Sequence, residues 1–169
     1  MLGISPEYAH RDRRGVPSAL CYYTCEMACP YFYPLQARAQ AGENARLPLG
    51  DSWAGICRAI PGDHWQPEET VVRPLCNLGY ARGNCARFPE GDGPDAVRFA
   101  VSGDDSGCIR IYYVMERDHR PYAHGPLEYS RDAGILVPAP GDDTLTRQAT
   151  AYLESYLRRK ADVDTGNGR

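Results

Sequence analysis

Apolar and polar residues alternate most clearly in the second half of the chain. Every second residue is apolar over residues 96–102 and again over residues 108–117, which is the period of a half-buried β-strand. The residues between them, 103–107, begin and end with glycine and predict a hairpin loop. Residues 125–130 and 135–138 are predicted as two shorter strands. Together they indicate an antiparallel β-meander with one buried face.

A helix is predicted over residues 143–160, because apolar residues recur there at helical spacing. Asp142 or Asp143 is the expected N-cap, and the basic residues 158–160 suit the C-terminal end of the helix dipole. We expect the apolar stripe to pack on the open face of the sheet. The stripe consists of Leu145, Ala149, Tyr152, Leu153, Tyr156 and Leu157. Residues 163–169 are expected to be a disordered tail.

Residues 1–95 show no clear period and are rich in residues that interrupt helices and strands. They hold ten of the 14 prolines and ten of the 17 glycines, which predicts turns and short irregular segments. Three short helices are expected there. They span residues 18–29, residues 36–45, where a loop is the alternative, and residues 68–76, interrupted at Pro74.

These patterns predict an α+β protein in three parts. An irregular, cysteine-rich region over residues 1–95 surrounds a metal centre. A small antiparallel β-meander covered by a C-terminal helix occupies residues 96–162, and the disordered tail follows. Ordering the irregular region costs roughly 1–2 kcal/mol per residue in backbone entropy, and a bound metal is one source of compensating free energy.

Composition and charge argue against several classes of function. The chain has 169 residues, a net charge of −3 and a pI of about 5.8, whereas nucleic-acid-binding domains are usually basic. No apolar run approaches the ~18 residues of a membrane helix, and residues 1–15 lack the apolar segment of a signal peptide. We therefore expect a cytoplasmic protein with no membrane or nucleic-acid partner.

The seven cysteines are the strongest chemical signal in the sequence. Six of them precede residue 86, and in a reducing cytoplasm such a group indicates metal or redox chemistry rather than disulfides. Four lie among glycine and proline, where backbone N–H groups can approach a thiolate closely. We predict that these four hold one metal centre. They are Cys29, Cys57, Cys76 and Cys85.

The other cysteines and one histidine are weaker candidates. Cys21, Cys25 and Cys29 follow one another at four-residue spacing, so that on a helix only neighbours reach the same metal. Cys25 is therefore the reserve ligand, and His64 is a further substitute for one cysteine. Cys21 is interpreted as a small apolar core residue, and Cys108 as a core or edge residue of a strand.

The spacing of the predicted ligands favours an iron–sulfur cluster over zinc. Structural zinc usually uses two closely spaced cysteine pairs. These cysteines are dispersed and include one Cys-Pro step, which is better matched by a [4Fe–4S] cluster held at four corners. The spacing matches no ferredoxin motif. Zinc is the alternative metal, and a chain without metal is the third interpretation.

Three functions are open for such a centre. The preferred one is a small iron–sulfur protein for electron transfer or redox sensing, with a redox partner protein. The second is a binding module in which zinc or a cluster is purely structural and the hairpin forms the interaction surface. The third is an enzyme that uses a cluster with an open iron site, three cysteine ligands, and His119 or His124 nearby.

Two further groups of residues are candidates for chemistry. His119 and His124 flank a turn with charged neighbours, which indicates a polar hairpin tip, with an acid–base cluster as the alternative. An aromatic group is predicted to pack around the cluster, with base stacking beside Arg38 as the alternative. Its members are Tyr22, Tyr23, Tyr31, Phe32 and Tyr33. No phosphate-binding loop, dinucleotide-binding, zinc-protease or nucleophile-elbow motif is present.

Overall fold

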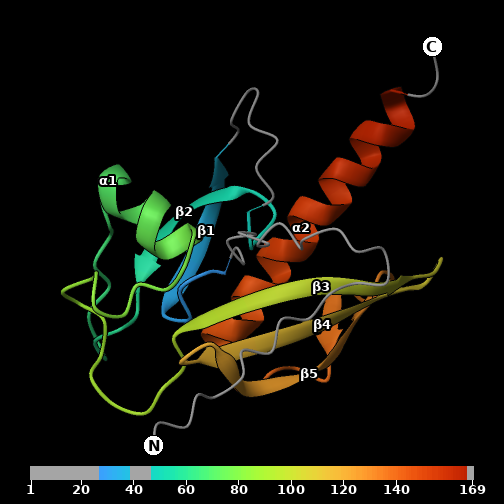
Figure 1. The fold of residues 1–169 in the computed structure, drawn as a ribbon. Coiled ribbons are helices and arrows are strands. Elements are labelled where there is room, and N and C mark those ends of the chain that lie inside the picture. Colours follow the sequence, from blue (N-terminus) through green and yellow to red (C-terminus); the bar gives the residue numbers. More distant parts are fainter. Residues whose placement is uncertain (1–26, 39–46, 167–169) are drawn as a thin grey trace, which may run out of the picture.

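The computed structural model describes residues 27–38 and 47–166. They form a two-stranded sheet, a four-stranded sheet, two short helical segments and one long C-terminal helix. The four-stranded sheet lies across the first turns of the long helix, and the two-stranded sheet lies beside the same part of that helix (Figure 1). The predicted α+β class, with a β-meander and a C-terminal helix, is confirmed.

The four-stranded sheet is the predicted meander. Its strands are β3 (Ala96–Asp104), β4 (Cys108–Arg117), β5 (Arg120–Ser130) and β6 (Ile135–Val137). They lie in the order β3-β4-β5-β6, and each pairs antiparallel with its neighbour. Strand β5 begins earlier than predicted, because the turn before it is very short.

That turn consists of two residues with left-handed backbone conformation. Asp118 and His119 have φ values of 48° and 58°, as a type I′ hairpin turn requires at both central positions. Arg117 pairs directly with Arg120 across the turn. The sequence lacks the glycine that usually marks such a turn, which explains why the strand was predicted to start later.

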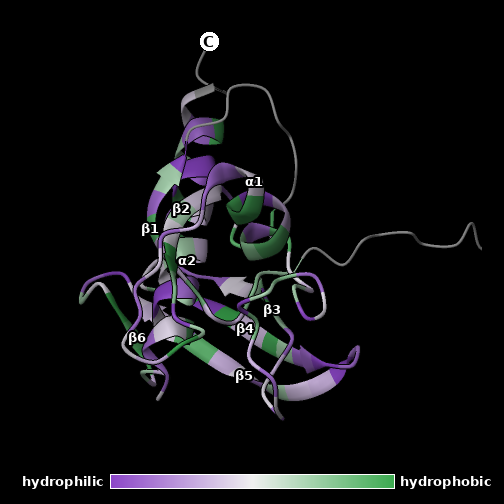
Figure 2. Cartoon of the chain, turned by 90° about the vertical axis from the view of Figure 1, so that its left-hand side faces the viewer, coloured by the Kyte–Doolittle hydropathy of each residue, from purple (hydrophilic) through white to green (hydrophobic). Residues whose placement is uncertain are grey.

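Alternation along the strands gives the sheet one covered face. Ile109, Ile111 and Leu127 are at most 3% exposed, whereas Arg110 and Tyr112 on the other face are exposed. Strands β3 to β5 accordingly carry alternating hydrophilic and hydrophobic segments (Figure 2). The covered face carries the conventional core of the protein.

Helix α2 (Asp143–Gly166) packs on this covered face. The Leu145 N–H donates to Asp142 Oδ1 at 2.7 Å, so that Asp142 is the N-cap. The predicted apolar stripe is buried or half-buried, and Tyr152 stacks on Phe99 of β3 with ring centroids 5.7 Å apart. The predicted packing of helix on sheet is therefore confirmed.

The helix continues further than predicted. Residues 163–166 are helical rather than part of a disordered tail, and residues 167–169 lie outside the described part. The basic residues 158–160 consequently lie before the last turn, and the expectation that they complement the helix dipole is wrong. Arg158 instead pairs with Asp51. Among the described helices, none is long and apolar enough to cross a membrane.

The two-stranded sheet was not predicted. Strand β1 (Phe32–Arg38) pairs antiparallel with β2 (Ser52–Cys57), with an irregular register between Pro34 and Gln36. The sequence indicated a helix or a loop over residues 36–45. Residues 36–38 of that range belong to β1 instead, and residues 39–46 lie outside the described part.

The helix expected over residues 68–76 is present in two segments. A single α-turn, α1 (Glu69–Val71), is followed by the π-helix η1 (Val72–Asn77). Pro74 lies inside η1 rather than ending it. A π-helical turn is rare in proteins and occurs often at functional sites.

The helix expected over residues 18–29 is wrong where it can be checked. Ala28 forms an isolated antiparallel bridge with Val97 of β3, and the two residues exchange backbone hydrogen bonds of 2.8 and 2.9 Å. The part before Met27 lies outside the described residues. The bridge attaches the turn that carries Cys29 to the four-stranded sheet.

One hydrophobic core joins the two predicted regions. Its buried side chains include Phe32 and Trp53 from the cysteine-rich region, and Ile111 and Leu153 from the meander and its helix. The cysteine-rich region therefore packs directly against the regular part of the fold.

Candidate metal centre

The four cysteines predicted as ligands line one pocket. Cys29, Cys57 and Cys76 are buried, and Cys85 is half-buried. The remaining lining residues are mostly apolar or aromatic. They are Tyr31, Phe32, Ala59, Trp65, Leu75, Ala81, Arg87 and Phe88. The thiols of residues up to 56 positions apart in the sequence thus meet in one place.

Each cysteine comes from a different local structure. Cys29 precedes a turn, Cys57 ends strand β2, Cys76 lies in the π-helix η1, and Cys85 lies in the turns that follow it. The prediction that all four lie in turn-rich backbone is therefore wrong for Cys57 and Cys76. Regular elements position these two thiols, which makes their placement more rigid than a loop would.

Each of three cysteines is fixed by a backbone hydrogen bond of its own N–H. The Cys29 N–H donates to the carbonyl oxygen of Cys76 at 2.9 Å and so joins two of the cysteine-bearing segments. The Cys57 N–H donates to the carbonyl oxygen of Trp65, which also lines the pocket, at 2.8 Å. The Cys85 N–H donates to the Ala81 carbonyl within its own loop at 2.8 Å.

The thiols influence one another electrostatically. Burial raises the pKa of Cys29 well above its ordinary value; a hydrogen bond from the Tyr31 N–H opposes this, and the other three cysteines raise it further. Burial, together with Cys57 and Cys85, raises the pKa of Cys76 to about 12. These two thiols are therefore neutral at pH 7, and a bound cation would have to displace their protons.

The cavity between the lining side chains is small. Its volume is about 20 Å³, room for roughly one water molecule. Among the described residues, Arg87 is the only one in the lining whose side chain is charged at neutral pH. Because the lining is otherwise almost wholly apolar, electrostatic interactions inside the pocket are weakly screened.

A buried asparagine fixes the position of Cys76. Asn77 is 1% exposed, and its Nδ2 donates to the carbonyl oxygens of Trp53 and Val72 at 3.0 Å each. Its Oδ1 accepts a hydrogen bond from the Trp53 N–H at 2.9 Å. Asn77 thereby joins η1 to β2, and so fixes Cys76 relative to Cys57.

A buried glutamine from helix α2 fixes the Cys29 turn. Gln148 is fully buried, and its Nε2 donates to the carbonyl oxygens of Cys29 at 2.8 Å and Phe32 at 2.7 Å. These two carbonyls flank the turn that places Cys29 at the pocket. The long helix therefore supports the site although it contributes no thiol.

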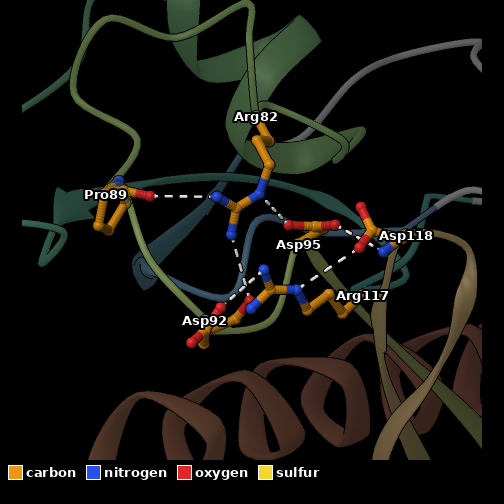
Figure 3. Close-up of polar contacts among 7 residues, drawn as sticks. Arg82, Pro89, Asp92, Asp95, Arg117 and Asp118 are labelled. Atoms are coloured by element: carbon orange, nitrogen blue, oxygen red, sulfur yellow. Dashed lines mark hydrogen bonds and ion pairs between the residues drawn. The ribbon is translucent and has the colours of Figure 1, made fainter.

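An ion-pair network closes the loop that carries Cys85 (Figure 3). Arg82 pairs with the buried carboxylate of Asp95 and donates to the carbonyl oxygens of Pro89 and Gly93 at 3.4 and 3.2 Å. Burial raises the pKa of Asp95, but the hydrogen bond from the Asp118 N–H and the Arg82 ion pair outweigh it and the net pKa is lowered. The carboxylate form is thus the one that holds the loop to the β4–β5 turn.

The weaker ligand candidates do not reach the pocket where they can be assessed. Cys21 and Cys25 lie outside the described residues. His64 is exposed and is not among the lining residues. Cys108 opens β4, an inner strand of the sheet, and is half-buried away from the pocket, so it is not an edge-strand residue.

The two turn histidines have separate partners. His119 stacks on Tyr80 with ring centroids 4.4 Å apart, and His124 Nδ1 lies 2.5 Å from the hydroxyl of Tyr112. This arrangement fits a polar hairpin tip better than a shared acid–base cluster.

Part of the predicted aromatic group surrounds the pocket. Tyr31 and Phe32 line it, Tyr33 lies 3.6 Å beneath the guanidinium of Arg58, and Arg38 pairs with Glu69. Tyr22 and Tyr23 lie outside the described residues.

Comparisons with known proteins add no constraint. The chain matches no protein-family model, no curated protein and no solved structure. Among the described residues, no group of three or more histidine, cysteine, aspartate or glutamate side chains is arranged to hold a metal ion.

Proposed function

We propose that this protein holds an iron–sulfur cluster, most simply [4Fe–4S], on Cys29, Cys57, Cys76 and Cys85, and uses it for electron transfer or redox sensing. The observation that carries the proposal is that these four thiols, from four separate segments, line one pocket. Cysteine is among the most buried residue types and usually lies singly in apolar cores. Four thiols sharing one pocket are unusual for that role and suit a shared inorganic centre.

The surroundings of the thiols support a cluster. Iron–sulfur potentials depend on hydrogen bonds to the sulfurs and on exclusion of solvent. The Tyr31 N–H donates to the Cys29 thiol, and aromatic side chains such as Phe32 and Phe88 line the pocket. The hydrogen bond would stabilise a thiolate at Cys29, and the aromatic lining would shield a cluster from solvent.

The ligand count favours electron transfer over catalysis. Four thiolates occupy all four corners of a [4Fe–4S] cluster, whereas an enzyme with an open iron site would use three. Cys85 is half-buried, so one corner of the centre would lie near the surface, where a redox partner protein could approach.

The size of the pocket sets a condition on this proposal. A metal–thiolate bond of about 2.3 Å is more than 1 Å shorter than a non-bonded contact of about 3.5–4.0 Å. Atoms bonded to the thiols can therefore lie closer to the pocket wall than the atoms of a molecule that is only in contact with it.

Zinc places a different condition on the same residues. Four Zn–S bonds of about 2.3 Å in tetrahedral geometry bring the sulfurs to about 3.8 Å from one another. A four-cornered cluster holds its ligand sulfurs farther apart than a single ion does, which suits thiols that come from four separate segments.

Metal analysis of the anaerobically purified full chain tests the proposal. We expect about four iron atoms and four acid-labile sulfides per chain, a brown colour with broad absorption near 400 nm, and bleaching by dithionite, as for a [4Fe–4S] cluster. A colourless protein with one zinc per chain would favour the structural alternative. A chain with neither metal would contradict the proposal.

Single alanine variants test the ligand set. Cys29→Ala, Cys57→Ala, Cys76→Ala and Cys85→Ala should each lose the absorption and most of the iron, because each removes one corner of the centre. Cys108→Ala is the matched control, since Cys108 lies outside the pocket, and it should keep the full iron content. A variant of the first group with normal iron would show that its residue is not a ligand.

A further inference from the structure

Arg87 has a distinctive position at the pocket. In the part of the chain that the structure describes, it is the one charged side chain of the lining, and its guanidinium lies 4.9 Å from the ring centre of Trp65. It pairs with Asp63. Its Nε is buried and has no hydrogen-bond partner among the described residues. A buried N–H donor is therefore available beside the thiols.

The Arg87 guanidinium also interacts with one of the four thiols. It lines the pocket beside Cys57 and makes a side-chain hydrogen bond with that thiol. Because a guanidinium stays protonated in proteins, a positive charge lies next to Cys57. Its side chain is 27% exposed, so solvent screens this charge only in part.

We propose that Arg87 sets the reduction potential of the centre, by donating a hydrogen bond to Cys57 Sγ and holding a positive charge beside it. The inference rests on the proposed iron–sulfur function. Reduction adds one electron to the centre and makes it more negative. A cation and an N–H donor at a ligand sulfur stabilise the reduced state more than the oxidised state. Arg87 therefore raises the potential.

The first test is a redox titration of the full, cluster-loaded chain with dithionite as reductant, at fixed pH and ionic strength. Arg87→Gln should lower the midpoint potential relative to the wild type, because it removes the charge and keeps a side chain of moderate size. Arg87→Lys should recover most of the difference, since it keeps the charge.

The second test predicts a shift of opposite sign. Asp63 neutralises part of the Arg87 charge, and its side chain is 43% exposed, so the substitution is compatible with folding. Asp63→Asn should raise the midpoint potential. If Arg87→Gln fails to take up iron, Arg87→Lys decides the question, because it keeps the charge but lacks the planar N–H donor at Cys57, and its potential should lie slightly below that of the wild type.

A neighbouring ion pair supplies matched controls. Arg58 follows Cys57 in the sequence, is 30% exposed, lies over Tyr33 and pairs with Asp143 at 2.5 Å. Like Arg87, it has a buried Nε without a partner among the described residues, but it does not line the pocket. Arg58→Gln and Asp143→Asn should therefore leave the potential close to that of the wild type.

The outcomes separate the two proposals. Opposite shifts for Arg87→Gln and Asp63→Asn, with unchanged controls, support the role of Arg87. A loaded wild type whose potential does not change in either variant, or changes in the same direction in both, overturns that role and leaves the cluster assignment intact. A wild-type chain without iron and sulfide overturns both.

Discussion

Asn77 shows how a side chain that makes no hydrogen bond to a thiol can still position the neighbouring cysteine. All three of its polar hydrogen-bonding contacts go to the backbone of β2 and η1, and the residue is buried. Removing the amide would leave the Trp53 N–H and two carbonyl oxygens without that partner. A buried group left unsatisfied costs about 1–3 kcal/mol.

We therefore expect Asn77→Ala to lower the free energy of unfolding by on the order of 3 kcal/mol. Urea unfolding followed by circular dichroism measures the change. Asn84→Ala is the control, since Asn84 is exposed in the same region and should change the free energy by no more than about 0.5 kcal/mol. Equal effects of the two substitutions would show that Asn77 does not join η1 to β2 as described.

The cysteines of the pocket were predictable from sequence and their supporting residues were not. Glycine and proline next to the cysteines are local signals, visible within a few positions. Asn77 contacts a strand 24 residues earlier, and Gln148 contacts a turn 116 to 119 residues earlier. In sequence, Gln148 is simply a polar residue in a helix. Only the direct succession of Cys76 and Asn77 offered a hint.

At the scale of elements, the predictions succeeded where alternation is unbroken. Residues 97–101 of β3 and 109–115 of β4 keep a regular period of two, and their registers become irregular only beyond these stretches. Strand β1 contains Pro34 and an irregular register directly after it. Proline usually indicates an edge strand or no strand, and Gly55 weakens the signal of β2. Gly55 is required there, because a Cβ would lie 2.2 Å from the Tyr33 carbonyl oxygen. The close pairing of β1 and β2 that positions Cys57 therefore requires a glycine, and this glycine makes β2 hard to predict from the sequence.

Helix α2 supports the Cys29 turn through Gln148, which gives a prediction about this element. Gln148→Leu keeps the side-chain size but removes the donor to two carbonyl oxygens. We expect the free energy of unfolding to fall by about 2 kcal/mol and the loaded centre to bleach faster in air. Urea unfolding and the decay of absorption near 400 nm measure these effects.

Gln66→Leu is the control for this substitution, because the Gln66 side chain is exposed. It should change neither the unfolding free energy nor the bleaching rate appreciably. A Gln148 variant that unfolds earlier but keeps the wild-type bleaching rate would show that α2 stabilises the fold without positioning Cys29.

At the scale of the whole molecule, the pocket is lined by residues from the range 29–88 and is supported from outside by the long helix and the β4–β5 turn. Strand β2 contributes Cys57, and the helical segment η1 contributes Cys76. The long helix holds the turn of Cys29 through Gln148. The network of Arg82 and Asp95 ties the Cys85 loop to the β4–β5 turn (Figure 3). A cysteine-rich region with little regular structure of its own is thus ordered by the meander and its helix, in addition to any bound centre.

A second junction, far from the thiols in sequence, joins the helix to the sheet. Asp104 at the end of β3 accepts hydrogen bonds from Lys160 at 2.7 Å, Tyr156 at 2.6 Å and Arg131 at 2.6 Å. These three donors hold the pKa of Asp104 well below its ordinary value. Because the pKa is lower in the folded state, the carboxylate stabilises the fold above the unfolded-state pKa near 3.8. That contribution is lost as the pH falls further.

The pH dependence of Asp104→Asn follows from this sign. At pH 7 the variant should melt at a lower temperature than the wild type, because an amide replaces a carboxylate facing two cations. Below about pH 4 the difference in melting temperature should shrink, since the unfolded wild-type chain takes up a proton on Asp104 there while the folded carboxylate, with its lowered pKa, stays ionised. Calorimetry of both chains between pH 7 and pH 3 measures this difference.

Asp105→Asn is the control, because Asp105 is exposed and its side chain pairs only with Arg110 among the described residues. If the difference in melting temperature between Asp104→Asn and the wild type stays constant with pH, the charge of Asp104 does not stabilise this junction.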